Sequence, residues 1–187
     1  LVMSFTTDWL FPPEQAQTLV DAVIANNQPV SYCNVTSQCG HDAFLLPHEL
    51  DVYGELIRAF LANVSGKPLA DRDTALAEAE AGADIARPTS IFHARRLDYD
   101  RLLELIPATA SVLDLGCGNG ELLSRLARRG CHRLMGLELD ESAILACVRR
   151  GLDVVHSDLE RGLNSFADKQ FDYVVLSQTL QAVRDVA

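Results

Sequence analysis

Apolar side chains in the first part of the chain follow two spacings. Continuous apolar runs predict strands over 1–5 and 30–35. Between them, after Pro12 and Pro13, apolar residues recur at intervals of three and four, which is typical of an amphipathic helix that begins at a proline. The same spacing predicts a second helix over 53–61. This part therefore has the pattern of a strand–helix–strand–helix unit.

A second series of strands and helices follows further along the chain. Because strands that alternate with helices form parallel sheets with right-handed crossovers, the pattern predicts an α/β fold. The predicted strands span 112–115, 134–139, 154–155 and a fully apolar 171–176, and the predicted helices span 97–106, 122–126 and 143–148.

The two units are separated by a stretch of different composition. Residues 66–90 are rich in Ala, Asp and Glu and contain no aromatic residue, which favours a linker. We therefore expect three segments: an amino-terminal unit over 1–65, the linker over 66–90 and a second unit over 91–187.

Composition narrows the class of protein. The chain is 48% hydrophobic and carries a net charge of −10, so it is able to bury a core, and neither a nucleic acid nor an anionic membrane is the expected partner. It has neither a membrane-length apolar run nor a signal peptide. The five cysteines form no Cys-x-x-Cys pair and have no histidine cluster at zinc spacing, which predicts reduced thiols, a cytoplasmic location and no metal.

A glycine-rich loop, DLGCGNG from Asp114 to Gly120, lies between a predicted strand and a predicted helix. Glycines at such a turn provide positive φ angles and let a ligand lie against the backbone. The loop departs from the dinucleotide fingerprint, because Glu121 stands at the position of the last glycine. Asp114 is a poor neighbour for a pyrophosphate but suits a cationic ligand.

Two further acids follow the next strands. Glu138 ends one strand, where a carboxylate is able to accept hydrogen bonds from ribose hydroxyls, and Asp158 ends the next, where it is able to accept one from an adenine amino group. In α/β sheets, ligands bind at this edge. Each residue alone is more typical of a turn or a helix cap, and an NAD-binding domain stays open as an alternative.

These segments carry a family resemblance. The segments VLDLGCGNGELL, GLELD, SDLE and FDYVVLSQTLQAVRD resemble class I S-adenosylmethionine (SAM)-dependent methyltransferases, and within them the MetW family, over about 97–187. The resemblance implies a Rossmann-like fold that is truncated here. It places Ser177 and Gln178 on the methyl-acceptor side. The implied SAM-binding residues are Asp114, Gly116, Cys117, Gly118, Gly120, Glu138 (ribose), Leu139, Asp158 (adenine), Leu159 and Ser177.

The amino-terminal unit offers a second kind of chemistry. Asp8 and His41 each lie in a loop after a predicted strand, in the acid-then-histidine order of α/β-hydrolase triads. In such a triad the carboxylate orients the imidazole, which moves the proton. Asp42 is an alternative carboxylate, but adjacent residues rarely face each other. We expect His48 and His93 to be structural.

This unit also resembles a known family. SFTTDWLFPPEQAQTLVDAV and CGHDAFLLPHEL are similar to the carboxy-terminal end of homoserine O-acetyltransferases, some relatives of which use succinyl groups. The resemblance covers about 1–65. It implies the end of an α/β-hydrolase fold, with Asp8 and His41 as the catalytic pair. The chain contains no Gly-x-Ser-x-Gly elbow, so this fragment alone is expected to be inactive.

Together the two resemblances suggest a fusion in methionine biosynthesis. The leading hypothesis is a homoserine O-acyltransferase, with acetyl-CoA or succinyl-CoA as donor and homoserine as acceptor, that carries a SAM-binding domain. The alternatives for that domain are methyl transfer to an unknown acceptor and non-catalytic regulation of the acyltransferase. The oligomeric state is left open, with a homodimer of the full-length protein as one candidate.

Overall fold

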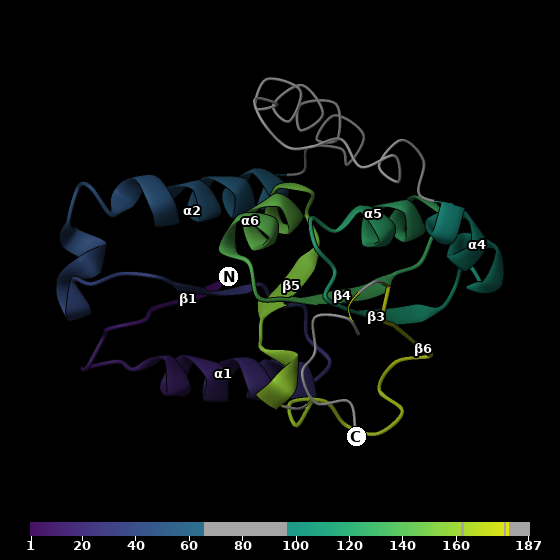
Figure 1. Cartoon of the computed structure of the whole chain (residues 1–187), viewed down its shortest axis with the longest axis horizontal. Helices are drawn as coiled ribbons and strands as arrows, with labels where there is room; N and C mark the ends of the chain where they lie inside the picture. Colours follow the sequence, from purple (N-terminus) through teal and green to yellow (C-terminus); the bar gives the residue numbers. More distant parts are fainter. Residues whose placement is uncertain (66–96, 162, 178, 180–187) are drawn as a thin grey trace.

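The computed structural model describes residues 1–65, 97–161, 163–177 and 179. A six-stranded sheet forms its centre, with helices on both faces (Figure 1). All neighbouring strands are parallel, as the alternation of strands and helices predicts. In spatial order the strands are β1 (Val2–Phe5), β2 (Tyr32–Val35), β5 (Asp153–His156), β4 (Arg133–Glu138), β3 (Ser111–Leu115) and β6 (Tyr173–Val175).

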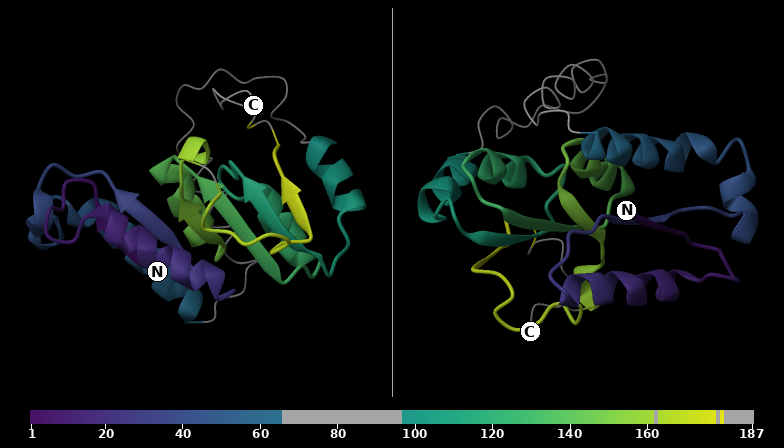
Figure 2. Two further views of the ribbon diagram at one scale, coloured as in Figure 1. Left: turned by 90° about the horizontal axis from the view of Figure 1, so that it is seen from below. Right: turned by 180° about the vertical axis from the view of Figure 1, so that it is seen from behind.

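The helices are divided unequally between the two faces of the sheet (Figures 1 and 2). One face carries α2 (Leu50–Val64), α4 (Leu97–Leu105), α5 (Glu121–Arg128) and α6 (Glu141–Arg149), and the other carries α1 (Pro13–Ala25). Two short 3-10 helices, η1 (Gly40–Leu45) and η2 (Leu159–Arg161), follow β2 and β5. None of the helices in the described part of the chain has the length and hydropathy to cross a membrane.

Local sequence explains where several helices begin. Pro13 is the first residue of α1, where a missing amide hydrogen costs nothing. Asp140 precedes α6, and its side chain accepts a hydrogen bond from the amide of Ala143 at 2.8 Å. Gly120 precedes α5 with a φ of 76°, a left-handed conformation that favours glycine.

Both hydrophobic cores draw residues from the two halves of the chain. On the α1 face, Val20 and Ile24 pack in one cluster with Leu113 and Leu137. On the other face, the cluster joins β1, β2 and α2 to α5 and α6. Because each large aliphatic side chain contributes about 1.5–3 kcal/mol when fully buried, the shared cores hold the two halves together as one body.

The two halves of the chain meet where strand β2 pairs with β5 and where α2 packs against α6. We call this boundary the junction. Tyr32 is in register with Val155, and the amide of Asn34 donates to Nδ1 of His156 at 3.2 Å. Burial lowers the pKa of His156, which suits a ring nitrogen that accepts. Between the helices, Arg149 pairs with Glu55 at 3.0 Å.

Some predicted boundaries were wrong. The last strand begins at Tyr173 rather than at residue 171, and the run is not fully apolar. Asp172 accepts hydrogen bonds from the amide (2.8 Å) and hydroxyl (2.7 Å) of Ser111, so it anchors the entry to β6. Asp158 lies two residues beyond the end of β5 rather than at it. The predicted linker over 66–90 falls outside the described residues.

Candidate functional sites

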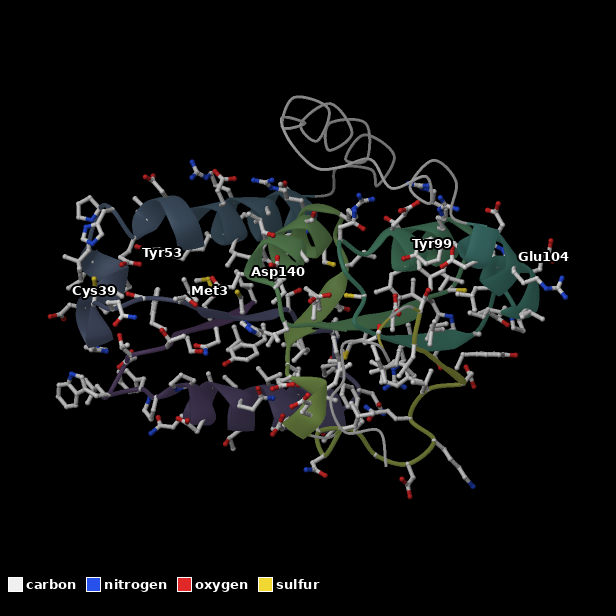
Figure 3. The ribbon with its side chains drawn as sticks, in the orientation of Figure 1. Met3, Cys39, Tyr53, Tyr99, Glu104 and Asp140 are labelled. Atoms are coloured by element: carbon white, nitrogen blue, oxygen red, sulfur yellow. The ribbon has the colours of Figure 1, made fainter. Side chains whose placement is uncertain are left out.

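Two groups of predicted residues lie at the carboxyl edge of the sheet, some distance apart. The first group is Asp8 and His41, and the second is the glycine loop with Glu138 and Asp158. In Figure 3 Cys39 lies next to the loops of the first group, at the end of the molecule formed by β1 and β2. Asp140 lies nearer the middle of the sheet, two residues after Glu138 of the second group. All the strands are parallel, so their carboxyl ends share one edge.

Asp8 and His41 meet across the loops that follow β1 and β2. Nδ1 of His41 lies 3.2 Å from Oδ1 and 3.1 Å from Oδ2 of Asp8, which makes the ring nitrogen a donor to the carboxylate. The ring is flanked by Phe11 and Phe44, with centroids 5.3 and 5.5 Å away. His41 therefore has its Nδ1 fixed by an acid, which leaves Nε2 for proton transfer.

Backbone amides keep the Asp8 carboxylate ionised. Asp8 is only 8% exposed, and burial by itself raises the pKa of a carboxyl group. The amides of Phe11 and Leu10 donate to Oδ1, each at 2.9 Å, and His41 adds a third donor. These donors outweigh the burial and lower the pKa of Asp8 below its usual value. The residue is thus a buried anion held against an imidazole.

Hydroxyl groups tie the two loops together. The Thr6 hydroxyl donates to the carbonyl of Ser37 at 3.0 Å and accepts from the Ser37 amide at 3.0 Å. The Thr7 hydroxyl donates to the same carbonyl at 2.9 Å and accepts from the amide of Gly40 at 2.9 Å. These bonds position Asp8 and His41 before any ligand arrives.

An open cleft of about 600 Å³ lies beside the pair. Asp8, His41, Phe11 and Phe44 line one part of it, and β1 lines another. The imidazole of His41 therefore lies at an open cleft that β1, α1 and the two loops line.

The glycine loop connects β3 to α5 and contains three positive φ angles, 74° at Gly116, 55° at Gly118 and 76° at Gly120. A Cβ at Gly116 would lie 2.6 Å from the Thr179 side chain, and one at Gly120 would lie 2.5 Å from Leu152. A Cβ at Gly118 would meet nothing within 4 Å. Two of the glycines thus serve close packing, whereas Gly118 faces space that a ligand is able to fill.

Glu138 braces this loop from the end of β4. Its Oε2 accepts from the amide of Gly118 at 2.7 Å, and its Oε1 accepts from the amides of Leu139 (2.7 Å) and Asp140 (3.0 Å). A carboxylate oxygen has room for a second donor, so Oε2 remains able to accept a hydroxyl beside Gly118. The Leu139 side chain, in the loop between β4 and α6, is 59% exposed.

The loop after β5 lies next to Glu138. The amide of Ser157 donates to the Glu138 carbonyl at 3.0 Å. Asp158 is the next residue in this loop. Oδ1 of Asp158 accepts from the amide of Glu160 at 3.0 Å, which caps η2, and Leu159 packs against the α1-side core. Asp158 therefore has one carboxylate oxygen engaged in its own turn.

The remaining predicted residues of this site have different surroundings. Asp114 is buried, 3% exposed, at the end of β3. Cys117 turns into the core towards Cys147, with the sulfurs 3.8 Å apart, and this contact together with burial raises the pKa of its thiol. Cys117 thus faces a ligand only through its backbone.

The Ser177 hydroxyl, predicted on the methyl-acceptor side, donates to Asp98 of α4 at 3.1 Å, and Gln178 lies outside the described residues.

A contact that the sequence did not predict connects the surroundings of the two sites. The amide and hydroxyl of Thr36, directly after β2, donate to Oε1 of Glu141 at 3.1 and 2.5 Å. Glu141 opens α6, three residues after Glu138. No local pattern marks this pair, because its members are 105 residues apart.

Residues 96–187 match a family model described as methionine biosynthesis protein MetW. The second half of the chain is a MetW domain. The whole chain is 41% identical to a bifunctional methionine biosynthesis protein MetXA/MetW from Rhodopirellula baltica, of which it covers 28%. It is also 52% identical, over 61 residues, to a homoserine O-succinyltransferase from Acinetobacter baylyi, of which it covers 15%. The chain thus spans a small part of these relatives, one of which also joins MetW to a second protein.

Among solved structures, a SAM-dependent methyltransferase from Mesorhizobium loti is 26% identical with a TM-score of 0.40. That match covers 48% of this chain and 42% of the other. The parallel sheet and its glycine loop, rather than this score, establish the α/β fold of the MetW domain.

Proposed function

We propose that the chain is the junction of a protein that acylates homoserine and that binds SAM through its MetW domain. The Asp8–His41 pair is the observation that carries the acyl-transfer part of the proposal. A buried ionised carboxylate held against Nδ1 and a histidine beside an open cleft fit the roles of two triad members: the carboxylate orients the ring, and the imidazole transfers the proton. The resemblance to homoserine acyltransferases adds the substrates.

The proposed reaction has two half-reactions. A serine from the rest of an α/β-hydrolase domain loses its proton to Nε2 of His41 and attacks the thioester of an acyl-CoA, and the CoA thiol leaves with that proton. The homoserine hydroxyl then gives its proton to His41 and attacks the acyl-serine, which returns the serine with its proton. Throughout, Asp8 stabilises the imidazolium.

The donor is either acetyl-CoA or succinyl-CoA. The printed name of the Acinetobacter relative, homoserine O-succinyltransferase, supports succinyl-CoA, and the sequence resemblance to homoserine O-acetyltransferases supports acetyl-CoA, so both donors are tested. Reduced cysteines and a role in methionine synthesis support a cytoplasmic location.

The test of the acyl-transfer proposal is CoA release by the full-length protein and two histidine variants. His41→Ala should lower the rate about 10³-fold or more, because proton transfer at both half-reactions is lost. The exposed His132, far from the pair in sequence and fold, provides the control, and His132→Ala should retain the wild-type rate. A His41→Ala protein that turns over like the control would refute the assignment.

SAM binding rests on the glycine loop and its acids. The open space at Gly118, the Glu138 carboxylate beside it and Asp158 in the neighbouring loop support a nucleoside site. Glu138→Gln should weaken SAM binding about 10-fold or more, because a charged acceptor for the ribose is lost. Titration calorimetry measures this, with Asp168→Asn as the control for loss of an exposed acid. Equal dissociation constants would contradict the ribose role.

For the MetW domain, the Thr36–Glu141 contact favours regulation over methyl transfer to a separate acceptor. It links the loop after Glu138 to the loop that holds Thr6 and Thr7 beside Asp8. SAM bound at Glu138 is then able to alter the position of the acyl-transfer pair. Adding SAM to the acyl-transfer assay tests this: a changed rate without S-adenosylhomocysteine supports regulation, and formation of that product supports methyl transfer.

A further inference from the structure

Three side chains of different chemistry gather at the two ends of the segment that carries His41. Sγ of Cys39 lies 3.3 Å from Oε1 of Glu49 and 3.7 Å from Nε2 of His48, and the last two atoms are 3.8 Å apart. They are 9 and 10 residues apart in sequence, with η1 between them. The cluster is separate from the Asp8–His41 pair, although it shares the loop that carries His41.

The three distances match the geometry of a tetrahedral zinc ion. Zinc binds sulfur at about 2.3 Å and nitrogen or oxygen at about 2.0–2.2 Å. Two such ligands at a tetrahedral angle are separated by about 3.3–3.6 Å. Each of the three observed separations lies within a few tenths of an ångström of this range, or at its edge, so small side-chain rotations bring all three atoms onto one ion.

The chemistry of the donors also selects among metals. A thiolate, an imidazole and a carboxylate are a mixed set of soft and harder ligands, which suits zinc, whereas calcium and magnesium prefer oxygen alone. The thiolate and the carboxylate together neutralise a divalent charge. The His48 side chain is 68% exposed, so solvent reaches the cluster and supplies the fourth ligand.

We propose that Cys39, His48 and Glu49 bind a zinc ion that clips together the two ends of the segment carrying His41. Cys39 precedes η1 and Glu49 precedes α2, so one ion bound to both residues closes the segment that contains η1. The loop is already held at its middle, where the Tyr53 hydroxyl donates to the carbonyl of Phe44 at 2.6 Å. With zinc bound, the Cys39–Glu49 segment exchanges its amides more slowly, and His41 stays facing Asp8.

Cobalt(II) is the first probe, because a thiolate ligand gives it a charge-transfer band in the near ultraviolet. The wild-type full-length protein should bind one Co²⁺ with this band, and excess Zn²⁺ should remove it. Cys39→Ser should abolish the band. A wild-type protein without the band, or a Cys39→Ser protein that keeps it, would overturn the proposal.

Zinc affinity, measured by calorimetry with Zn²⁺ alone, gives the second test. His48→Ala and Glu49→Gln should each weaken binding at least 10-fold, and His48 is exposed enough that its loss leaves the fold intact. Asp51→Asn is the matched control, since Asp51 is an exposed acid two residues along and outside the cluster. It should bind zinc within 2-fold of the wild type. Equal affinities in His48→Ala and the wild type would exclude the site.

Amide exchange connects the ion to the loop. Zinc should slow exchange over Cys39–Glu49 in the wild type and leave it unchanged in His48→Ala. If zinc bound to the wild type without changing the amide exchange rates, the zinc site would stand but its role in holding the segment together would be refuted. None of these readouts requires acyl transfer, so the proposal fails or stands independently of the proposed function.

Discussion

The two candidate sites hold their acids in different ways. Asp8 is buried and faces another side chain, His41, across two loops that hydroxyl groups bind together. Glu138 instead binds the amide of Gly118 in the glycine loop, beside open space, and Asp158 binds the amide of Glu160 in its own turn. In the proposed function, the first arrangement is a reactive pair and the second is a rigid rim for a ligand. Substitutions should therefore affect the rate at the first site and the affinity at the second.

The largest effect is expected at Asp8. Asp8→Asn in the full-length protein should lower the rate of CoA release about 10³–10⁴-fold, because the imidazole loses its anionic partner and its preferred tautomer. SAM affinity should stay within 2-fold of the wild type. The rate comes from a CoA thiol assay and the affinity from calorimetry. A large loss of SAM affinity would contradict the expectation that substitutions at the first site affect only the rate.

Two neighbouring glycines sharpen the contrast between packing and binding. Gly118→Ala and Gly120→Ala both place an alanine at a positive φ, which costs about 1–2 kcal/mol in each case. Only the second adds a clash, with Leu152 at 2.5 Å, for a total of about 2–5 kcal/mol. Urea unfolding should show Gly120→Ala as the less stable variant. Gly118→Ala should keep most of its stability and lose SAM binding at least 10-fold.

If both glycine variants lost the same stability, the space at Gly118 would not be open as described. If Gly118→Ala bound SAM normally, the ligand would lie elsewhere.

The positions of the glycine loop and of the acids in the MetW domain were predictable because their signals are local. The glycine loop, Glu138 and Asp158 each follow a strand, and the parallel order of strands brings them to one edge. The junction was not predictable, because the pairing of Tyr32 with Val155 joins strands far apart in sequence that match no motif. Likewise, the Cys39 cluster has no zinc-like spacing. Its members meet only because η1 folds the loop between them.

A half-buried carboxyl outside both sites, that of Asp153, shows what donors contribute at Asp8. Burial raises the pKa of Asp153, at the start of β5, to about 6, whereas Asp8 has a lowered pKa because amides and His41 donate to it. The stability associated with neutral Asp153 is complete below its unfolded pKa and is lost as the pH rises through about 6. Asp153→Asn should therefore gain about 1–3 kcal/mol over the wild type at pH 8 and little at pH 4.

Chemical denaturation at the two pH values measures this difference. A gain of equal size at both would show that the carboxyl is not titrating in this range.

The smallest effect is expected at the junction. Glu141→Gln should reduce the change in acyl-transfer rate that SAM causes by a few fold, about 1 kcal/mol of coupling, because the acceptor for Thr36 loses its charge. Glu55→Gln, which weakens the other contact across the junction, is the control and should preserve the response to SAM. Steady-state rates with and without SAM provide the comparison. If the Glu141→Gln variant responded to SAM as the wild type does, the Thr36–Glu141 contact would not couple the two sites.

The most direct test of the whole account is CoA release by the wild-type full-length protein, with and without homoserine. The proposed function predicts that CoA is released from acetyl-CoA or succinyl-CoA only when homoserine is present. CoA release at the same rate with and without homoserine, or no release with either donor, would contradict the proposed function.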